Sequence, residues 1–140
     1  MSEPAGQSRS GGCLCGAVRY QVRGRLRPII MCHCGQCARV TGNVMAATAA
    51  RLRDFELGSA AELTWYDSSG QARRGFCGRC GSTLFWQGAG RDYISIAAGS
   101  LDDASGLTVA QHIYVADRKP YDTIPDAAPH SPDGKFSLSW

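Results

Sequence analysis

Seven cysteines in three short groups constrain this chain more than any other feature of its sequence. In chain order the groups are Cys13 and Cys15, then Cys32, Cys34 and Cys37, then Cys77 and Cys80. An odd number of cysteines leaves one thiol over in any disulfide scheme. Neighbouring cysteines at spacings of two or three residues are typical of thiolates that converge on one metal ion. The sequence therefore indicates metal binding rather than a disulfide framework.

The first and third groups each supply half of a tetrahedral site. Side chains alternate along a strand, so C-x-C places two sulfurs on one face, whereas C-x-x-C-G bends the backbone around a metal. Together the two pairs predict a closed site with four thiolates, from Cys13, Cys15, Cys77 and Cys80. Such a site would join the start of the chain to its middle as a structural staple.

The central group, Cys32, Cys34 and Cys37, has no fourth cysteine to complete a tetrahedron. We therefore expect an open fourth position, as in catalytic zinc sites. Two alternatives are that a histidine fills this position, or that the group is a further staple. His33 lies between two ligands on one extended segment, so its ring should point away from their metal, and His112 belongs to a separate β-like segment. We expect both histidines to pack or to support the ligands.

Zinc is the metal that these thiolate sets favour, with two Zn²⁺ expected per chain. Iron–sulfur clusters are a weaker alternative, because the spacing matches neither ferredoxin pattern. The formal net charge of +3 falls to zero when seven thiolates and two Zn²⁺ are counted. No run of five or more Lys and Arg residues is present, so the sequence does not indicate nucleic-acid binding.

A chain of 140 residues has the length of one domain, and its pattern predicts a mainly β fold of short antiparallel sheets. We expect a flexible N-terminal tail over residues 1–10, a zinc-stapled domain over 11–130 and a C-terminal tail over 131–140. One short helical turn is expected over Gly35–Thr41, ended by Gly42. Strands are expected over Ala17–Arg23, Pro28–Cys34, Val44–Ala50, Glu62–Tyr66, Arg73–Cys77, Ser82–Gln87, Tyr93–Ala98 and Leu107–Val115.

The cellular location follows from two further observations. No segment approaches the roughly 20 apolar residues of a membrane span, and the N-terminus has no apolar run. Reduced metal-binding cysteines suit a reducing compartment. We therefore expect a cytoplasmic protein.

The order of three motifs identifies a known family. Residues 11–20 read GGCLCGAVRY, residues 32–42 contain CHCGQC followed by TG, and residues 76–85 read FCGRCGSTLF. This pattern resembles the glutathione-dependent formaldehyde-activating family, which includes the centromere protein V domain. The similarity extends to about residue 129, through AGSLD at 98–102 and HIYVADRKP at 112–120.

The resemblance implies a tent-like arrangement of small antiparallel sheets and a role for each cysteine cluster. A structural zinc would be held by Cys13, Cys15, Cys77 and Cys80, and a catalytic zinc by Cys32, Cys34 and Cys37. The implied reaction is carbon–sulfur lyase or synthase chemistry on adducts of glutathione, or a similar thiol, with formaldehyde or another small aldehyde. One departure is Tyr121 after Pro120, where the family often has tryptophan.

Three questions about the site stay open at the level of sequence. A non-catalytic zinc- or glutathione-binding or protein-interaction module is the alternative function. Four arginines near the cysteine motifs are candidates for binding the carboxylates of glutathione, although each is as a rule a solvated surface residue. They are Arg39, Arg73, Arg74 and Arg79, of which Arg79 is expected to offset the negative charge of the four-thiolate site rather than to bind substrate. Phe85 and Trp86 must point to opposite faces of their strand, so one of them can face the site.

Overall fold

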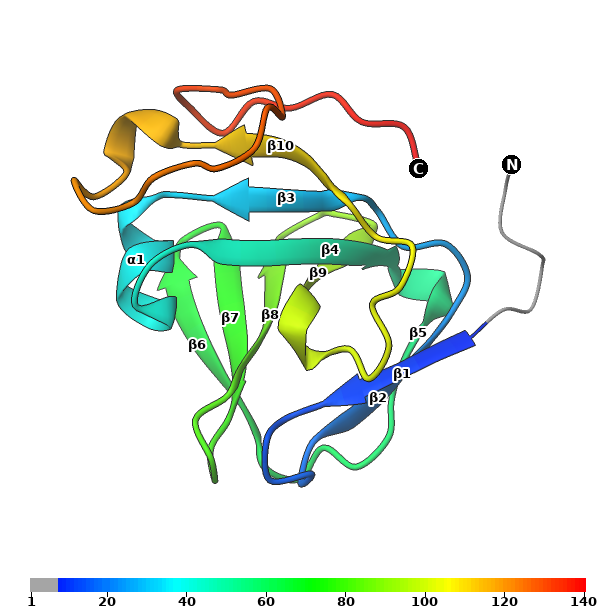
Figure 1. Ribbon diagram of the computed structural model, residues 1–140. Helices are drawn as coiled ribbons and strands as arrows, with labels where there is room; N and C mark the ends of the chain where they lie inside the picture. The colour runs from blue at the N-terminus through cyan, green and yellow to red at the C-terminus, as the bar shows by residue number, and fades with distance from the viewer. Residues whose placement is uncertain (1–7) are drawn as a thin grey trace.

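A computed structural model describes residues 8–140 of the chain as two sheets and one short helix (Figure 1). The smaller sheet has the order β1-β2-β5, and the larger has the order β10-β3-β4-β9-β8-β7-β6. The strands are β1 (Ser8–Gly12), β2 (Arg19–Arg23), β3 (Ile29–Cys32), β4 (Met45–Arg51), β5 (Phe55–Leu57), β6 (Leu63–Ser69), β7 (Ala72–Cys77), β8 (Thr83–Gly88), β9 (Tyr93–Ala97) and β10 (Val109–Ile113). The helix is α1 (Gly35–Thr41), and short 3₁₀ turns are η1 (Leu52–Asp54), η2 (Ala98–Ser100) and η3 (Val115–Asp117).

All neighbouring strands pair antiparallel except β10 and β3, which run parallel. In Figure 1, β3, β4 and β10 cross the upper part of the molecule, whereas β6, β7 and β8 descend behind them. The larger sheet is thus strongly twisted, and its strands reach both cysteine clusters. The expected mainly β fold is confirmed, with mixed rather than purely antiparallel pairing in the larger sheet.

The eight predicted strands are present with ends shifted by a few residues, and the predicted helix has the expected bounds. Two strands, β1 and β5, have no counterpart among the predictions. The sequence of β1, SRSGG, has low β-propensity, and this strand exists because it pairs with β2. A side chain at Gly11 would collide with the Tyr20 ring and with the carbonyl of Ser100, so this strand needs glycine for close approach.

The predicted N-terminal tail falls mostly outside the described residues, and Ser8–Ser10 belong to β1. At the other end, the segment after residue 116 is irregular, as expected, and it lies along β10 and β3 (Figure 1). The ring of Trp140 packs against the ring of Tyr93. The guanidinium of Arg51 lies over the ring of Trp140, with Arg51 Cζ 3.8 Å from the centroid of the Trp140 ring.

The main hydrophobic core lies between the two sheets. Tyr20 of β2 and Phe55 of β5 contact Phe85 of β8, each with ring centroids 5.3 Å from the Phe85 ring. Phe85 is fully buried, and the core continues through Val18, Val22, Leu84, Ile94 and Ile96. A second, smaller cluster is formed by Cys37, Met45 and Ala47, which pack α1 onto β4.

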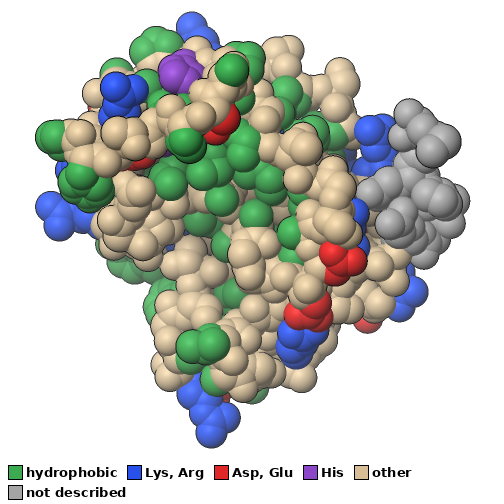
Figure 2. All heavy atoms as spheres, in the orientation of Figure 1, with side chains coloured by type: hydrophobic (Ala, Val, Ile, Leu, Met, Phe, Trp, Pro, Cys, Tyr) green, Lys and Arg blue, Asp and Glu red, His purple; other side chains and the backbone are tan. Residues whose placement is uncertain are grey.

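On the face shown in Figure 2, hydrophobic side chains gather in the middle, and Lys and Arg side chains are dispersed around the edge. This face therefore shows no continuous basic patch. No helix in residues 8–140 is long and apolar enough to cross a membrane.

Candidate metal centres

The first candidate centre joins the two sheets. Cys13 and Cys15 lie in the connection from β1 to β2, Cys77 ends β7, and Cys80 follows in the turn to β8. Their four sulfur atoms lie within 4.8 Å of one another. The Cys13–Cys15 and Cys15–Cys77 sulfur distances are 3.7 and 3.8 Å. Zn–S bonds of about 2.3 Å in a tetrahedron place sulfurs about 3.8 Å apart, so the cluster has the dimensions of a thiolate zinc site.

Backbone amides around this cluster donate hydrogen bonds to the sulfurs. Val18 N–H donates to Cys13 Sγ at 3.2 Å, and the amides of Arg79 and Cys80 donate to Cys77 Sγ at 3.3 and 3.4 Å. Donors aimed at sulfur favour the ionised thiolate, which is the form that binds metal. The donor set therefore fits a metal ion that needs thiolate ligands.

Two glycines shape this first centre. Gly16 and Gly81 both have φ near +80°, a backbone conformation that glycine adopts at little cost. Gly81 N–H donates to the carbonyl of Cys77 at 2.8 Å, which closes the C-x-x-C turn. The glycine after the second cysteine is thus required by the backbone of the turn.

The second candidate centre is built where β3 ends and α1 begins. Cys32 is the last residue of β3, Cys34 caps the helix, and Cys37 lies in its first turn. The three sulfurs lie within 4.8 Å of one another, and no fourth Cys, His, Asp or Glu of residues 8–140 joins the group. Cys37 is buried, whereas Cys32 and Cys34 are half-buried. This three-cysteine cluster could hold a metal ion with one coordination position left over.

Local hydrogen bonds explain how the sequence folds into this cluster. The Cys37 amide donates to Cys34 Sγ at 3.3 Å, and Gly42, with φ of +89°, ends the helix by donating to the Ala38 carbonyl. Thr41 Oγ1 donates to the Cys37 carbonyl at 2.7 Å, so its hydroxyl serves the end of the helix rather than a sulfur. In the Cys-x-Cys-x-x-Cys motif, the first cysteine therefore ends a strand, the second caps the helix, and the third lies in its first turn.

The three thiols lie so close together that their pKa values shift in different directions. Hydrogen bonds from the side chains of Cys32 and Cys37 lower the pKa of Cys34 to about 2. The same hydrogen bond with Cys34 raises the pKa of Cys32 above its usual range. Of the three thiols, that of Cys34 is therefore the one most readily ionised.

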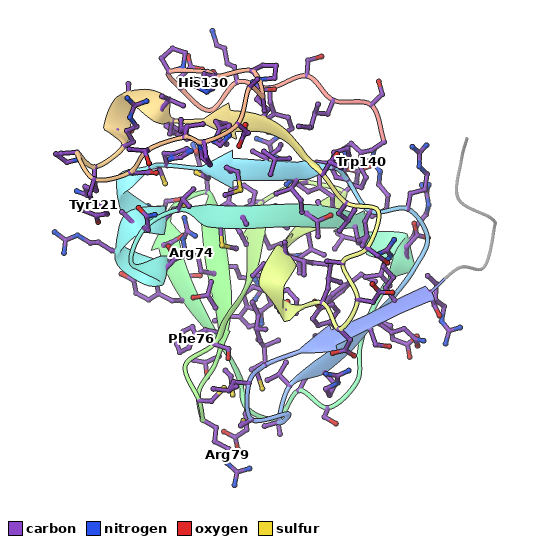
Figure 3. All side chains as sticks on the ribbon, in the orientation of Figure 1. Arg74, Phe76, Arg79, Tyr121, His130 and Trp140 are labelled. Carbon is purple, nitrogen blue, oxygen red and sulfur yellow. The ribbon has the colours of Figure 1, made fainter. Side chains whose placement is uncertain are left out.

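Arg74 is the cation next to the three-cysteine cluster. It lies in the middle of β7 and is 8% exposed, and its Nη2 is 3.7 Å from Cys37 Sγ. Its Nε and Nη2 also donate to Gln36 Oε1 at 3.2 and 3.1 Å, and Gln36 is held in turn by the Ser68 carbonyl. Figure 3 shows Arg74 beside α1. Burial beside sulfur makes this arginine part of the candidate centre.

The other three candidate arginines lie elsewhere. Arg73 points to the opposite face of β7, where its guanidinium stacks 3.9 Å from the Trp65 ring centroid and donates to Gln87. Arg79 is exposed at the tip of the C-x-x-C turn and points away from the molecule (Figure 3). Arg39 is exposed on α1. Because side chains alternate along a strand, Arg73 and Arg74 must point to opposite faces of the sheet. The sequence alone did not show which of these two faces lies against the three-cysteine cluster.

The structure shows which of the two aromatic residues of β8, Phe85 or Trp86, lies on the face of the sheet that carries Arg74. Phe85 is fully buried in the main core, between Tyr20 and Phe55. Trp86 is half-buried and stands opposite Arg74 in the β7–β8 register. Trp86 is therefore on the same face of the sheet as Arg74.

His33 and His112, which we expected to pack or to support the ligands, are not members of either cysteine cluster. His33 is buried and its Nδ1 lies 2.5 Å from Asp122 Oδ2, while its Nε2 lies 2.8 Å from Nδ1 of His112. His112 Nε2 lies 3.0 Å from Asp126 Oδ1. Sequence reasoning missed both aspartates, which lie in the proline-rich C-terminal segment 89 and 14 residues from their partners.

Two cavities of the molecule lie away from the cysteines. One of about 560 Å³ is formed by the β6–β7 and β8–β9 turns and is lined by residues such as Arg73, Gln87 and Arg91. Another of about 500 Å³ lies between η3 and His130. The three-cysteine cluster borders neither of them.

Comparisons with known proteins found a family and a solved structure that are similar to this chain. The sequence model of the family described as glutathione-dependent formaldehyde-activating enzyme matches residues 8–117. A crystal structure of a Rhodobacter sphaeroides protein is similar to this chain with a TM-score of 0.57 and 26% sequence identity, over 86% of this chain and 98% of that one. The comparison with curated proteins found no match. The family match contains all seven cysteines, Arg74 and His112.

Proposed function

Because this chain belongs to the glutathione-dependent formaldehyde-activating enzyme family, we propose that it is a zinc-dependent carbon–sulfur lyase or synthase. Its substrates are glutathione, or a similar thiol, and formaldehyde or another small aldehyde. The observation that carries the proposal is the cluster of Cys32, Cys34 and Cys37, whose three sulfurs converge without a fourth ligand from residues 8–140. An open position of this kind is where catalytic zinc sites take substrate.

We assign a different task to each cysteine cluster. Cys13, Cys15, Cys77 and Cys80 hold a structural zinc, which ties the small sheet to β7 and β8. Cys32, Cys34 and Cys37 hold the second zinc. When zinc is bound there, it lowers the pKa of a coordinating thiol, so that the thiolate of the substrate is available at neutral pH.

The chain's own residues set the charge of the second site. Three thiolates and one Zn²⁺ carry a net charge of −1, which disfavours strong polarisation of a carbonyl and leaves a thiolate nucleophilic. Arg74, 3.7 Å from Cys37 Sγ, offsets that charge. It thereby makes binding of an anionic thiolate less unfavourable. In the addition, the sulfur forms a bond to the carbonyl carbon, the carbonyl π pair moves to oxygen, and this oxygen takes the proton that the thiol lost.

The reducing cytoplasm is the location that this proposal requires. Seven cysteines in metal-binding spacing keep their function only while they stay reduced. Glutathione is also abundant as a free thiol only where the environment is reducing.

Exchange NMR on the zinc-loaded protein tests the activity. The rate at which formaldehyde and glutathione equilibrate should rise above the spontaneous rate and saturate with substrate. Cys34→Ser should abolish the acceleration and leave one zinc per chain in a folded protein. The matched variant Cys77→Ser should instead lose the folded domain, because structural zinc contributes about 10–16 kcal/mol, as much as the whole stability of a domain.

A binding module is the second candidate, and it is favoured by the observation that neither of the two cavities described above is lined by a cysteine of the cluster. Thiol binding at two zincs per chain, with no acceleration of the exchange, would support this role and rule out the proposed reaction.

A further inference from the structure

A chain of four polar side chains runs through the interior behind the three-cysteine cluster. Its members are, in order, Asp122, His33, His112 and Asp126. The successive distances are 2.5, 2.8 and 3.0 Å. The first three are 5%, 2% and 2% exposed, and Asp126 is 39% exposed at the surface. Buried polar groups are costly unless they are paired, and each side chain of this chain is paired with the next.

The hydrogen-bond chemistry fixes both imidazole rings. An ionised carboxylate only accepts, so Nδ1 of His33 donates to Asp122, and Nε2 of His112 donates to Asp126. The remaining nitrogens face each other across 2.8 Å. Two neutral rings with these tautomers would present two acceptors to each other, so a hydrogen bond between them requires one further proton, which makes one of the two rings an imidazolium. With that proton every ring nitrogen is engaged, and rotation of either ring would break two hydrogen bonds.

His33 connects this chain directly to the metal ligands, because it is the residue between Cys32 and Cys34. Its amide also donates to the carbonyl of Ile113 at 3.0 Å, which holds the end of β3 against β10. Contacts of both the side chain and the backbone of His33 thus fix the turn that carries Cys32 and Cys34.

The carboxylates reach this turn because the C-terminal segment folds back over it. Tyr114 is the one residue other than glycine with positive φ in residues 8–140, at +56°, and it reverses the chain just after β10. Ser131 then donates to the His112 carbonyl at 2.9 Å and closes the loop. A strained residue such as Tyr114 persists only where the surrounding contacts demand it.

We propose that the buried chain Asp122–His33–His112–Asp126 is a positioning device that holds the Cys32–Cys34 turn in its metal-binding geometry and sets how firmly the second zinc is retained. His33 is then a positioning residue, and the segment from Tyr114 to Ser131 belongs to the metal site although it supplies no ligand. This inference rests on the proposed ligation by Cys32, Cys34 and Cys37, but it does not depend on the reaction. Loss of a hydrogen-bonded support behind metal ligands typically lowers metal affinity by about 10–100-fold.

Release of zinc to a chromogenic chelator tests the proposal on the full, zinc-loaded chain. The variant is Asp122→Asn, and the matched control is Asp92→Asn, because Asp92 pairs with Arg51 far from the cluster and is 76% exposed. In Asp122→Asn, zinc of the three-cysteine cluster should leave about tenfold or more faster, and zinc of the four-cysteine cluster should leave at the wild-type rate. Asp126→Asn, at the exposed end, should give a smaller acceleration and serves if Asp122→Asn does not fold.

Imidazole nitrogen NMR gives a second readout that a purely structural role would not change. His33 should show its hydrogen on Nδ1 in the wild type, and this preference should weaken in Asp122→Asn. Equal release rates in wild type and both chain variants, or equal acceleration at both clusters, would overturn the proposal. A wild-type protein that holds only one zinc would overturn the ligation on which it rests, whereas two retained zincs without turnover would overturn only the proposed reaction.

Discussion

Replacing Arg74 with methionine removes the buried cation beside the three-cysteine cluster and keeps most of the side-chain volume. The guanidinium lies 3.7 Å from Cys37 Sγ and is 8% exposed, so solvent screens this interaction only weakly. The variant should therefore weaken metal retention at this cluster, and the four-cysteine cluster should be unaffected.

The magnitude follows from the distance. Two unit charges 3.7 Å apart interact by about 4 kcal/mol at an effective dielectric constant of about 20. Part of this is lost because the thiolate charge is shared with the metal, and because methionine avoids the cost of burying a guanidinium. A net loss of about 1.5–3 kcal/mol remains, which is roughly 10–100-fold in metal affinity.

Competition with a calibrated zinc chelator measures this change, and Arg73→Met is the matched control. Arg73 is the adjacent residue, but it points to the opposite face and stacks on Trp65, so its loss leaves the cluster unchanged. Equal zinc affinities for the two variants would refute the electrostatic role of Arg74. A loss of zinc from both clusters in Arg74→Met would also refute it, because that result would indicate general unfolding.

Three further predictions concern the fold. Phe85→Ala should lower the free energy of unfolding in urea by about 3–5 kcal/mol, because Phe85 is fully buried between the sheets; a loss below 1 kcal/mol would contradict its place in the core. Gly11→Ala should lower the melting temperature, since the added methyl group meets a tyrosine ring of β2, whereas Gly70→Ala, with open space around it, should not. The hydrogen bond from Arg19 lowers the pKa of Asp102 in the folded protein. This carboxylate therefore stabilises the fold at pH values above its unfolded pKa of about 3.9, and its contribution to the free energy of unfolding disappears as the pH falls through the lower, folded pKa. Asp102→Asn should therefore make the melting temperature slightly less sensitive to acid, and an unchanged acid profile would show that the pair is inactive in solution.

Local patterns in the sequence predicted most of the secondary structure. The helix over Gly35–Thr41 and its end at Gly42 were predictable because the cap and the C-terminal glycine act within one turn. The strand β1 was not, since its residues favour a strand only when β2 supplies the pairing and glycine permits the contact with Tyr20. Parallel pairing of β10 with β3 was also beyond prediction, because it joins segments 80 residues apart.

The sequence by itself showed which side chains of this protein could bind a metal. Cysteines two or three residues apart converge locally, so Cys32, Cys34 and Cys37 could be grouped from their spacing alone. Only the tertiary structure decided what surrounds them. Arg74 reaches Cys37 across 37 residues, and Asp122 reaches His33 across 89 residues. Such contacts depend on how the sheet twists and where the C-terminal segment packs, and no spacing along the chain encodes them.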